Sequence, residues 1–278
     1  MIELSRSKKS KILRSNSTTI IIILIVVIVA SVLAPTKDSF IVINKDEDLE
    51  LYSSYGNGTM ENPFVIEDRI IANENTNAIS ITNTTKFFII RNCYVADNYG
   101  YGIYLKDIAN ATAKIMNNVV INHQISGIGL RNCNYVEISN NTIIENNYGI
   151  DLYESVNNTI TYNSLSKNIN GIIFSDYSSQ NTVLYNMFEN STSWGMIIFD
   201  FSNNNTIHHN NFLDNNFGGI SQAYDNSSFN LWYEQLTMEG NFWSEKTGPG
   251  NYSIAGSAGS VDLYPLNDSV QFYSSYQS

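Results

Sequence analysis

Hydrophobic and polar residues alternate along most of this chain, and two motifs that recur every 22–26 residues organise the alternation. The first motif is apolar-x-x-Asn-x-apolar, and its asparagines are Asn92, Asn118, Asn141, Asn163, Asn186 and Asn210. The second motif is Gly-apolar-x-apolar, and its glycines are Gly102, Gly127, Gly149, Gly171 and Gly195. Because two independent motifs keep one period, the sequence indicates a stack of structural repeats.

Each repeat predicts three short strands and no helix. The unit is too short to contain a helix, and its alternation has the period of a strand. One unit cannot bury its apolar face alone, so the units must stack on one another. The sequence therefore predicts an all-β fold, a single-stranded parallel β-helix with about seven coils of 22–26 residues, preceded by an N-terminal hydrophobic helix.

The recurring asparagines and glycines have a physical reason in such a fold. A sharp bend between strands needs left-handed backbone geometry, which asparagine tolerates better than most residues with a side chain. Asparagines at the same bend of every coil can also bond to those above and below them. We therefore predict an asparagine ladder, and bends at the glycines, where no Cβ is in the way.

The N-terminal segment differs from the repeats. Five Lys or Arg residues between Arg6 and Arg14 precede an apolar run over residues 18–34. A basic flank before such a run is the signature of a signal peptide or a signal anchor. We expect a retained anchor, and the alternative is a peptide cleaved at Ala30 or Ser31. In both cases the body of the chain is exported.

These features divide the chain into four predicted parts. Residues 1–34 form a cytoplasmic basic stub with the signal anchor or signal peptide, and residues 35–50 form a linker. Residues 51–245 form the β-helix, and residues 246–278 form an irregular C-terminal cap and tail. The expected location is extracytoplasmic, with the body attached to the membrane through residues 18–34, or secreted if that segment is cleaved.

The charge balance narrows the range of partners. The whole chain has a net charge of −11, and its first 34 residues hold five Lys or Arg and one Glu, so the remainder has a net charge of −15. An acidic body repels nucleic acid, which is therefore not an expected partner. Asn-x-Ser/Thr sequons agree with an exported protein. The glycosylation candidates are Asn57, Asn83, Asn110, Asn157 and Asn204.

Aligning the repeats by their anchors places acidic and amide residues in one vertical column, which reads Asn83, Asp107, Asn132, Glu154, Asp176 and Asp200. Glu154, Asp176 and Asp200 would follow one another at about 5 Å per coil. Such carboxylates could bind a calcium-like cation or act as the carboxylate pair of a glycoside hydrolase. A turn position, where Asp and Asn cap the backbone, explains the same column. No catalytic residue is assigned, and these three are weak candidates.

A second column lies just before the ladder and contains Arg91, Tyr162, Tyr185 and His209. Stacked aromatic side chains suit sugar rings, and they suit the surface of a β-sheet equally well. Tyr162, Tyr185 and His209 are therefore the candidate glycan-binding residues.

Taken together, these stretches resemble a known family. The segment GNGTMENPFVIED at residues 56–68, the Gly/Asn coils, and the late GNFWSE and VDLYPL stretches are similar to the right-handed parallel β-helix proteins grouped with NosD. The resemblance covers roughly residues 50–267 and implies a right-handed β-helix. Members of the family are exported and are described as copper-binding, carbohydrate-binding or sugar-hydrolase-type proteins. In relatives an acidic loop suited to a cation follows the late motif, whereas here Glu245 and Asp262 are its only acids.

Copper binding, which the resemblance implies, requires clustered His, Met or Cys side chains. His208 and His209 are neighbours on one predicted strand, and we expect them to face opposite ways. Cys93 and Cys133 would lie about 10 Å apart, beyond the reach of a disulfide, so we expect free thiols. No metal site is predicted.

The sequence thus predicts an exported, membrane-anchored β-helix scaffold that binds a glycan or a cell-envelope protein without catalysis. The alternative is a glycoside hydrolase or lyase that acts on polysaccharide. A further alternative, from the resemblance, is a NosD-like helper in copper-site maturation.

Overall fold

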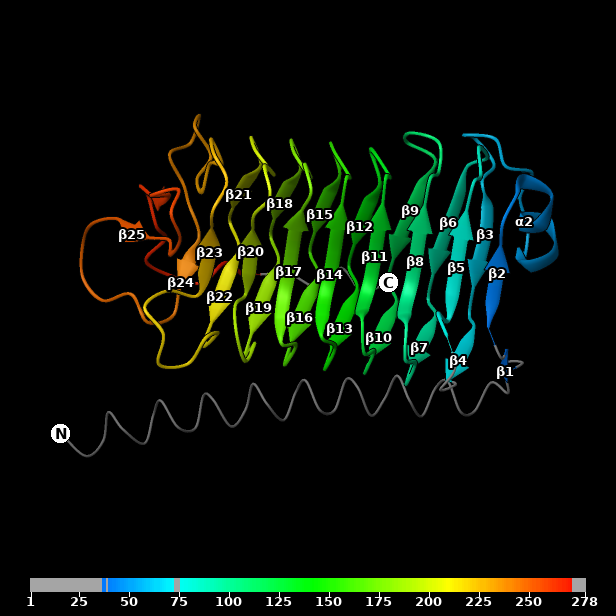
Figure 1. The fold of residues 1–278 in the computed structure, drawn as a ribbon, viewed down its shortest axis with the longest axis horizontal. Helices are drawn as coiled ribbons and strands as arrows, with labels where there is room; N and C mark the ends of the chain where they lie inside the picture. Colours follow the sequence, from blue (N-terminus) through cyan, green and yellow to red (C-terminus); the bar gives the residue numbers. More distant parts are fainter. Residues whose placement is uncertain (1–36, 39, 73–75, 272–278) are drawn as a thin grey trace. The chain divides into compact units, whose positions relative to one another are not determined.

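The alternating sequence folds into three short strands per coil, and the coils stack so that the strands form three parallel sheets (Figure 1). The structure is a computed structural model, and it describes residues 37–38, 40–72 and 76–271. Successive coils pair in register, as Ile103, Ile128 and Ile150 do, and these side chains form the core. The predicted all-β parallel β-helix of about seven coils is confirmed.

The nine-stranded sheet contains, in spatial order, β1 (Lys37–Asp38), β4 (Ile70–Ala72), β7 (Tyr94–Ala96), β10 (Val119–Ile121), β13 (Thr142–Ile144), β16 (Ser164–Ser166), β19 (Met187–Glu189), β22 (Asn211–Leu213) and β24 (Phe242–Trp243). The eight-stranded sheet contains β2 (Ile41–Ile43), β5 (Ile79–Thr82), β8 (Tyr101–Lys106), β11 (Ser126–Arg131), β14 (Tyr148–Tyr153), β17 (Asn170–Ser175), β20 (Met196–Ile198) and β23 (Ala223–Asp225). The seven-stranded sheet contains β21 (Thr206–His208), β18 (Thr182–Leu184), β15 (Thr159–Thr161), β12 (Glu137–Ser139), β9 (Ala113–Met116), β6 (Phe88–Arg91) and β3 (Phe64–Glu67).

The solenoid begins earlier than the predicted residue 51. Within residues 35–50, which were expected to be a linker, β2 pairs with β5, and the short helix α2 (Asp46–Tyr52) begins and buries Leu49. The predicted stub and hydrophobic helix, residues 1–34, lie outside the described residues. Within the part of the chain that is described, no helix combines the length and the apolar character needed to cross a membrane.

A buried ladder of asparagines runs along the solenoid at one bend between the seven-stranded and nine-stranded sheets. Its rungs are Asn118, Asn141, Asn163, Asn186, Asn210 and Asn241. Each side-chain oxygen accepts from the backbone N–H of the preceding rung, and each side-chain nitrogen donates to the next oxygen, at 2.9–3.1 Å. The amides therefore satisfy one another and the bend without solvent.

The prediction was wrong at Asn92, which is not a rung. Strand register pairs Ile90 with Ile115, so Cys93 falls opposite Asn118 and its backbone N–H donates to the Asn118 Oδ1 at 3.0 Å. Asn92 is exposed and has a φ of 53°. It occupies the left-handed turn position just before the ladder.

The five repeated glycines do not supply left-handed bends, since none has a positive φ. They allow close approach instead. A Cβ at Gly149 would lie 2.5 Å from the carbonyl oxygen of Gly171 in the next coil, and one at Gly171 would lie 2.3 Å from that of Gly195. Any side chain would separate the coils at this edge.

The C-terminal end of the core is closed by a stack of aromatic rings. Phe188, Phe212, Trp243 and Tyr252 lie face to face with centroids 4.6, 4.2 and 4.0 Å apart. Residues 246–271 are irregular except for the antiparallel pair β25 (Tyr252–Ser253) and β26 (Val261–Asp262). This cap shields the last coil from strand addition.

Candidate functional site

The outer face of the eight-stranded sheet carries large aromatic side chains on several of its strands. Residues between the core positions point outward because side chains alternate along a strand. One outward column reads Tyr104, Gly129, Asp151, Ile173, Ile197 and Tyr224, and a second reads Lys106, Arg131, Tyr153 and Ser175. We call these two columns, together with Tyr101 and Trp194, the aromatic face.

A polar cluster lies at the centre of the aromatic face. Arg131 donates from Nη2 to the Tyr101 hydroxyl at 2.9 Å and to Asp151 Oδ2 at 3.0 Å. Its guanidinium carbon lies 4.5 Å from the ring centroid of Tyr153, a cation–π distance. Tyr101 also packs against Tyr104, with centroids 4.7 Å apart. Three directions of contact thus fix the guanidinium.

The cluster is unusually dry for an outward face. Asp151 is only 6 % exposed, and burial raises the pKa of its carboxyl while the Arg131 charge opposes that rise. Gly129 makes room for the arrangement, because a Cβ there would lie 2.5 Å from the Cδ1 and Cε1 atoms of Tyr101. The Tyr101 ring therefore lies close over the backbone at Gly129.

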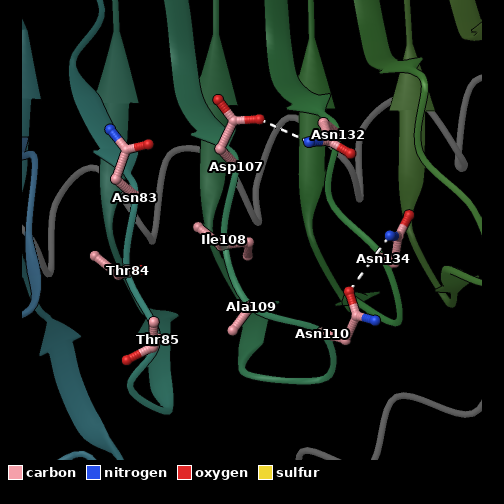
Figure 2. A pocket seen from close by; sticks show the side chains of 9 residues that line it. All are labelled: Asn83, Thr84, Thr85, Asp107, Ile108, Ala109, Asn110, Asn132 and Asn134. Carbon is pink, nitrogen blue, oxygen red and sulfur yellow. Dashed lines mark hydrogen bonds between the residues drawn. The ribbon is translucent and has the colours of Figure 1, made fainter.

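A shallow depression of about 380 Å³ adjoins this face at the corner after β5, β8 and β11 (Figure 2). Its lining is mostly amide and hydroxyl, and consists of Asn83, Thr84, Thr85, Asp107, Ile108, Ala109, Asn110, Asn132 and Asn134. Asn132 donates to Asp107 at 2.8 Å, and Asn134 donates to Asn110 at 3.3 Å. Such a surface offers donors and acceptors that match hydroxyl groups.

The acidic column predicted from the sequence lies at this same corner and is a column of turns. All six members have φ between 46° and 55°, the left-handed geometry of the bend. Asn83, Asp107 and Asn132 line the depression, but Glu154, Asp176 and Asp200 do not. In the described part of the chain, no group of three or more His, Cys, Asp or Glu side chains is arranged to hold a metal ion. A calcium-like cation there stays a prediction.

The predicted aromatic column does come together, but its geometry is poor for stacking on sugars. Tyr162 and Tyr185 stack at 5.1 Å with an interplanar angle of 13°, and Tyr185 lies 5.2 Å from His209. Tyr185 lies between Tyr162 and His209, so both sides of its ring have a neighbouring ring. Arg91 does not belong to the column, since it pairs with Met116 within the strand and Asn92 holds the turn position.

Strand alternation predicted that His208 and His209 face opposite ways, and this prediction was wrong. Their Nδ1 atoms are 2.6 Å apart. The strand ends at His208, and His209 has a φ of 54°, so the backbone turns the second ring back towards the first.

Both cysteines are buried and free. Burial raises the pKa of Cys93 to about 12 and that of Cys133 to about 11. These thiols are therefore poor nucleophiles and metal ligands at neutral pH.

Sequence reasoning missed the aromatic face although its signal is in the repeat. The motif Gly-apolar-x-apolar contains it, because the x position and the residue after the motif point outward. Reading those positions down the repeats gives Tyr104, Asp151, Arg131 and Tyr153. The two repeating motifs are defined by buried and turn positions, so their period does not itself point to the outward side chains.

Comparisons with known proteins agree with this architecture. The family model for a right-handed β-helix region matches residues 45–188 and 77–243. Among solved structures, a mutant of the periplasmic alginate epimerase AlgG is 20% identical with a TM-score of 0.41, and the match covers 60% of this chain and 40% of that one. DFA-IIIase from Arthrobacter chlorophenolicus is 17% identical with a TM-score of 0.43, over 65% of this chain and 53% of that one.

The A-module of the mannuronan C-5 epimerase AlgE4 from Azotobacter vinelandii is 9% identical with a TM-score of 0.33, over 74% of this chain and 82% of that one. This chain spans about half the length of AlgG and DFA-IIIase. Comparison with curated proteins gives no match.

Proposed function

This chain belongs to the right-handed β-helix family, and we propose that it binds a glycan along the aromatic face of its eight-stranded sheet. The observation that carries the proposal is the Arg131 cluster, in which one guanidinium is held by Tyr101, Asp151 and the Tyr153 ring. Binding sites for small polar ligands combine aromatic surface with a few fixed polar groups, and this face has both.

The two parts of the site complement the two surfaces of a sugar. The apolar C–H face of a pyranose packs on aromatic rings, and Tyr104 and Tyr153 offer them on neighbouring columns. The hydroxyl groups need donors and acceptors, which Arg131, Asp151 and the amides of the corner depression supply. Asp107 and Asn132 directly follow Lys106 and Arg131 in sequence, so a chain of sugars can run from the aromatic face over the corner.

The proposed role is binding without catalysis. Hydrolysis of a glycosidic bond uses two carboxyl groups that flank it. Asp151 is the one carboxylate in the two described outward columns, and Arg131 already engages it. Nothing observed in the described residues favours the alternative hydrolase or lyase at Glu154, Asp176 and Asp200, or the copper-maturation role.

The proposed setting is the cell envelope, with the body outside the cytoplasm. The basic flank and apolar run at residues 18–34 support this setting, and they would keep the protein on the membrane. A glycan of the envelope is then the natural ligand.

A glycan array probed with the full-length chain tests the proposal, together with an assay for released product. Binding with no product would support the proposal. Product that a Glu154→Gln, Asp176→Asn, Asp200→Asn variant cannot form would make the acidic column an active site. No binding to any glycan would contradict the proposal and favour a protein partner.

A further inference from the structure

The seventh coil carries an insertion between β23 and β24 that folds back over the end of β21. Leu231 bridges to Thr206, and the backbone N–H of His209 donates to the Gly240 carbonyl at 2.7 Å. The tip of the insertion, residues 233–239, is closed by one short pairing. The Glu234 N–H donates to the Glu239 carbonyl at 2.8 Å, and the Met238 N–H donates to the Glu234 carbonyl at 2.9 Å.

Two histidines of the β21 end hold this tip through their side chains. His209 Nε2 lies 2.9 Å from Glu239 Oε2, and His208 Nε2 lies 3.6 Å from Glu234 Oε2. The two rings meet through their Nδ1 atoms at 2.6 Å. The Tyr185 ring of the preceding coil packs against His209, tilted by 43° with the centroids 5.2 Å apart. The four titratable side chains thus form a continuous row of contacts that begins at Glu234 and ends at Glu239.

The number of protons on the two histidines decides whether the row of contacts from Glu234 to Glu239 can persist. Two neutral rings satisfy both short contacts when His208 carries its hydrogen on Nδ1 and His209 carries its hydrogen on Nε2. His208 then donates to His209, and His209 donates to Glu239. If both rings are charged, both Nδ1 atoms become donors, and a contact of 2.6 Å between them is impossible.

The surroundings also resist charge on the pair. His208 is only 7 % exposed, and burial together with the neighbouring His209 lowers the pKa of the His208 ring below its ordinary value. Glu234 offsets part of this effect at 3.6 Å. When the tip lifts, the His208 ring gains water and accepts a proton more readily. Acid therefore favours the open tip.

We propose that residues 233–239 form a latch that is closed while at least one of the His208 and His209 rings is neutral and opens when both rings are protonated. The moving part is limited to the tip, because both ends of the insertion are fixed. Trp232 is buried and donates to Asp225 at 3.2 Å, and Asn241 is the last rung of the ladder. Mild acidification would release the tip and leave the solenoid intact.

Hydrogen exchange of the full-length chain, followed by mass spectrometry and corrected for the intrinsic rate at each pH, tests the latch. The expected result is that the amides of Glu234 and Met238 lose protection below about pH 6.5, by at most about tenfold per pH unit, because opening lets the second ring of the pair take up its proton. The ladder amides around Asn163 should stay protected over the same range. Protection of the tip that does not change with pH would overturn the proposal.

Variants separate the latch from a general effect of acid. His208→Asn should remove the pH dependence of the tip, and His123→Asn, which changes another buried histidine, should keep it. If His208→Asn does not fold, Glu239→Gln serves instead, and it should weaken protection of the tip already at pH 7.5. A tip in His208→Asn or Glu239→Gln that behaves as in the unaltered chain would count against the proposal.

Discussion

The carboxylate of Asp262 ends the asparagine ladder by accepting from the backbone N–H of Asn241 at 2.8 Å. The same Oδ2 atom accepts from the Trp243 indole at 2.9 Å, and Oδ1 accepts from the Tyr264 N–H at 3.1 Å. A rung without a successor would leave buried donors unpaired. Asp262 replaces that successor, so this acid has a structural role in the cap.

Replacing Asp262 with alanine should destabilise the protein by about 3 kcal/mol, because three donors lose their acceptor in a buried site. Urea unfolding followed by tryptophan fluorescence measures this change. Asp268→Ala provides the matched control, since Asp268 is exposed, and it should change the unfolding free energy little. Equal effects of the two substitutions would show that the ladder needs no terminal acceptor.

A rung in the middle of the ladder should matter comparably. Asn163→Ala removes an amide that bonds to Asn141, Asn186 and the Ile138 carbonyl, and we expect a loss of about 2–4 kcal/mol. Asn147→Ala is the control, because its side chain makes no hydrogen bond among the described residues. If both variants melt at the same temperature, the ladder does not stabilise the stack.

Stability should fall in acid through His123. Burial lowers the pKa of His123 to about 4, so the ring is neutral in the folded state and gains a proton on unfolding. Its contribution is complete above the ordinary value of about 6.5 and is lost as the pH falls towards 4, which amounts to about 2 kcal/mol between pH 7.5 and 5.

The substitution His123→Asn isolates this effect. The backbone N–H of His123 donates to Asn146 Oδ1 at 3.0 Å, in a second ladder where the neighbouring rungs are asparagines. Asparagine should therefore fit the column. The measurement is the urea midpoint at several pH values, and the variant should show a flatter dependence than the unaltered chain. Parallel curves would assign the acid sensitivity to other groups.

Much of the fold follows from the sequence because the period is visible in residue identity. The coil number, the three strands and the rungs from Asn118 to Asn210 all follow from spacing. The error at Asn92 arose because Asn117 and Asn118 are adjacent and residue identity could not choose between them. The pairing of Ile90 with Ile115 places Asn92 beside Asn117 and Cys93 beside Asn118, and this strand register is visible only in the structure.

The site was less predictable for two physical reasons. The outward residues of a solenoid differ from coil to coil, so the repeat marks the positions of Arg131 and Asp151 but not their chemistry. Turn geometry also overrides strand alternation, as it does where a positive φ brings His209 onto His208. Further ladders, such as Asn158, Asn181 and Asn205, lie outside the two motifs, because a serine stands where the asparagine motif has its first apolar residue.

Gly129→Ala tests whether the Tyr101 ring is part of the binding surface. The new Cβ would displace a ring that now lies 2.5 Å from its position, which loosens the Tyr101 contact with Arg131. We expect weaker glycan binding, by about threefold to tenfold, with less than about 1.5 kcal/mol lost in stability. Ser253→Ala is the control, because Ser253 is exposed in the C-terminal cap and lies outside the aromatic face. Unchanged affinity in Gly129→Ala would remove Tyr101 from the site.

The most direct test of the proposed function compares the affinity of the array-selected glycan for the unaltered chain, Arg131→Gln and Lys114→Gln by calorimetry. Both variants lose one cation from an ion pair, but Lys114 pairs with Glu137 on the seven-stranded sheet. Arg131→Gln should bind about tenfold to a hundredfold more weakly, as for a lost hydrogen bond to a charged group, and Lys114→Gln should bind normally. Equal affinity of the two variants would contradict a glycan site on the aromatic face.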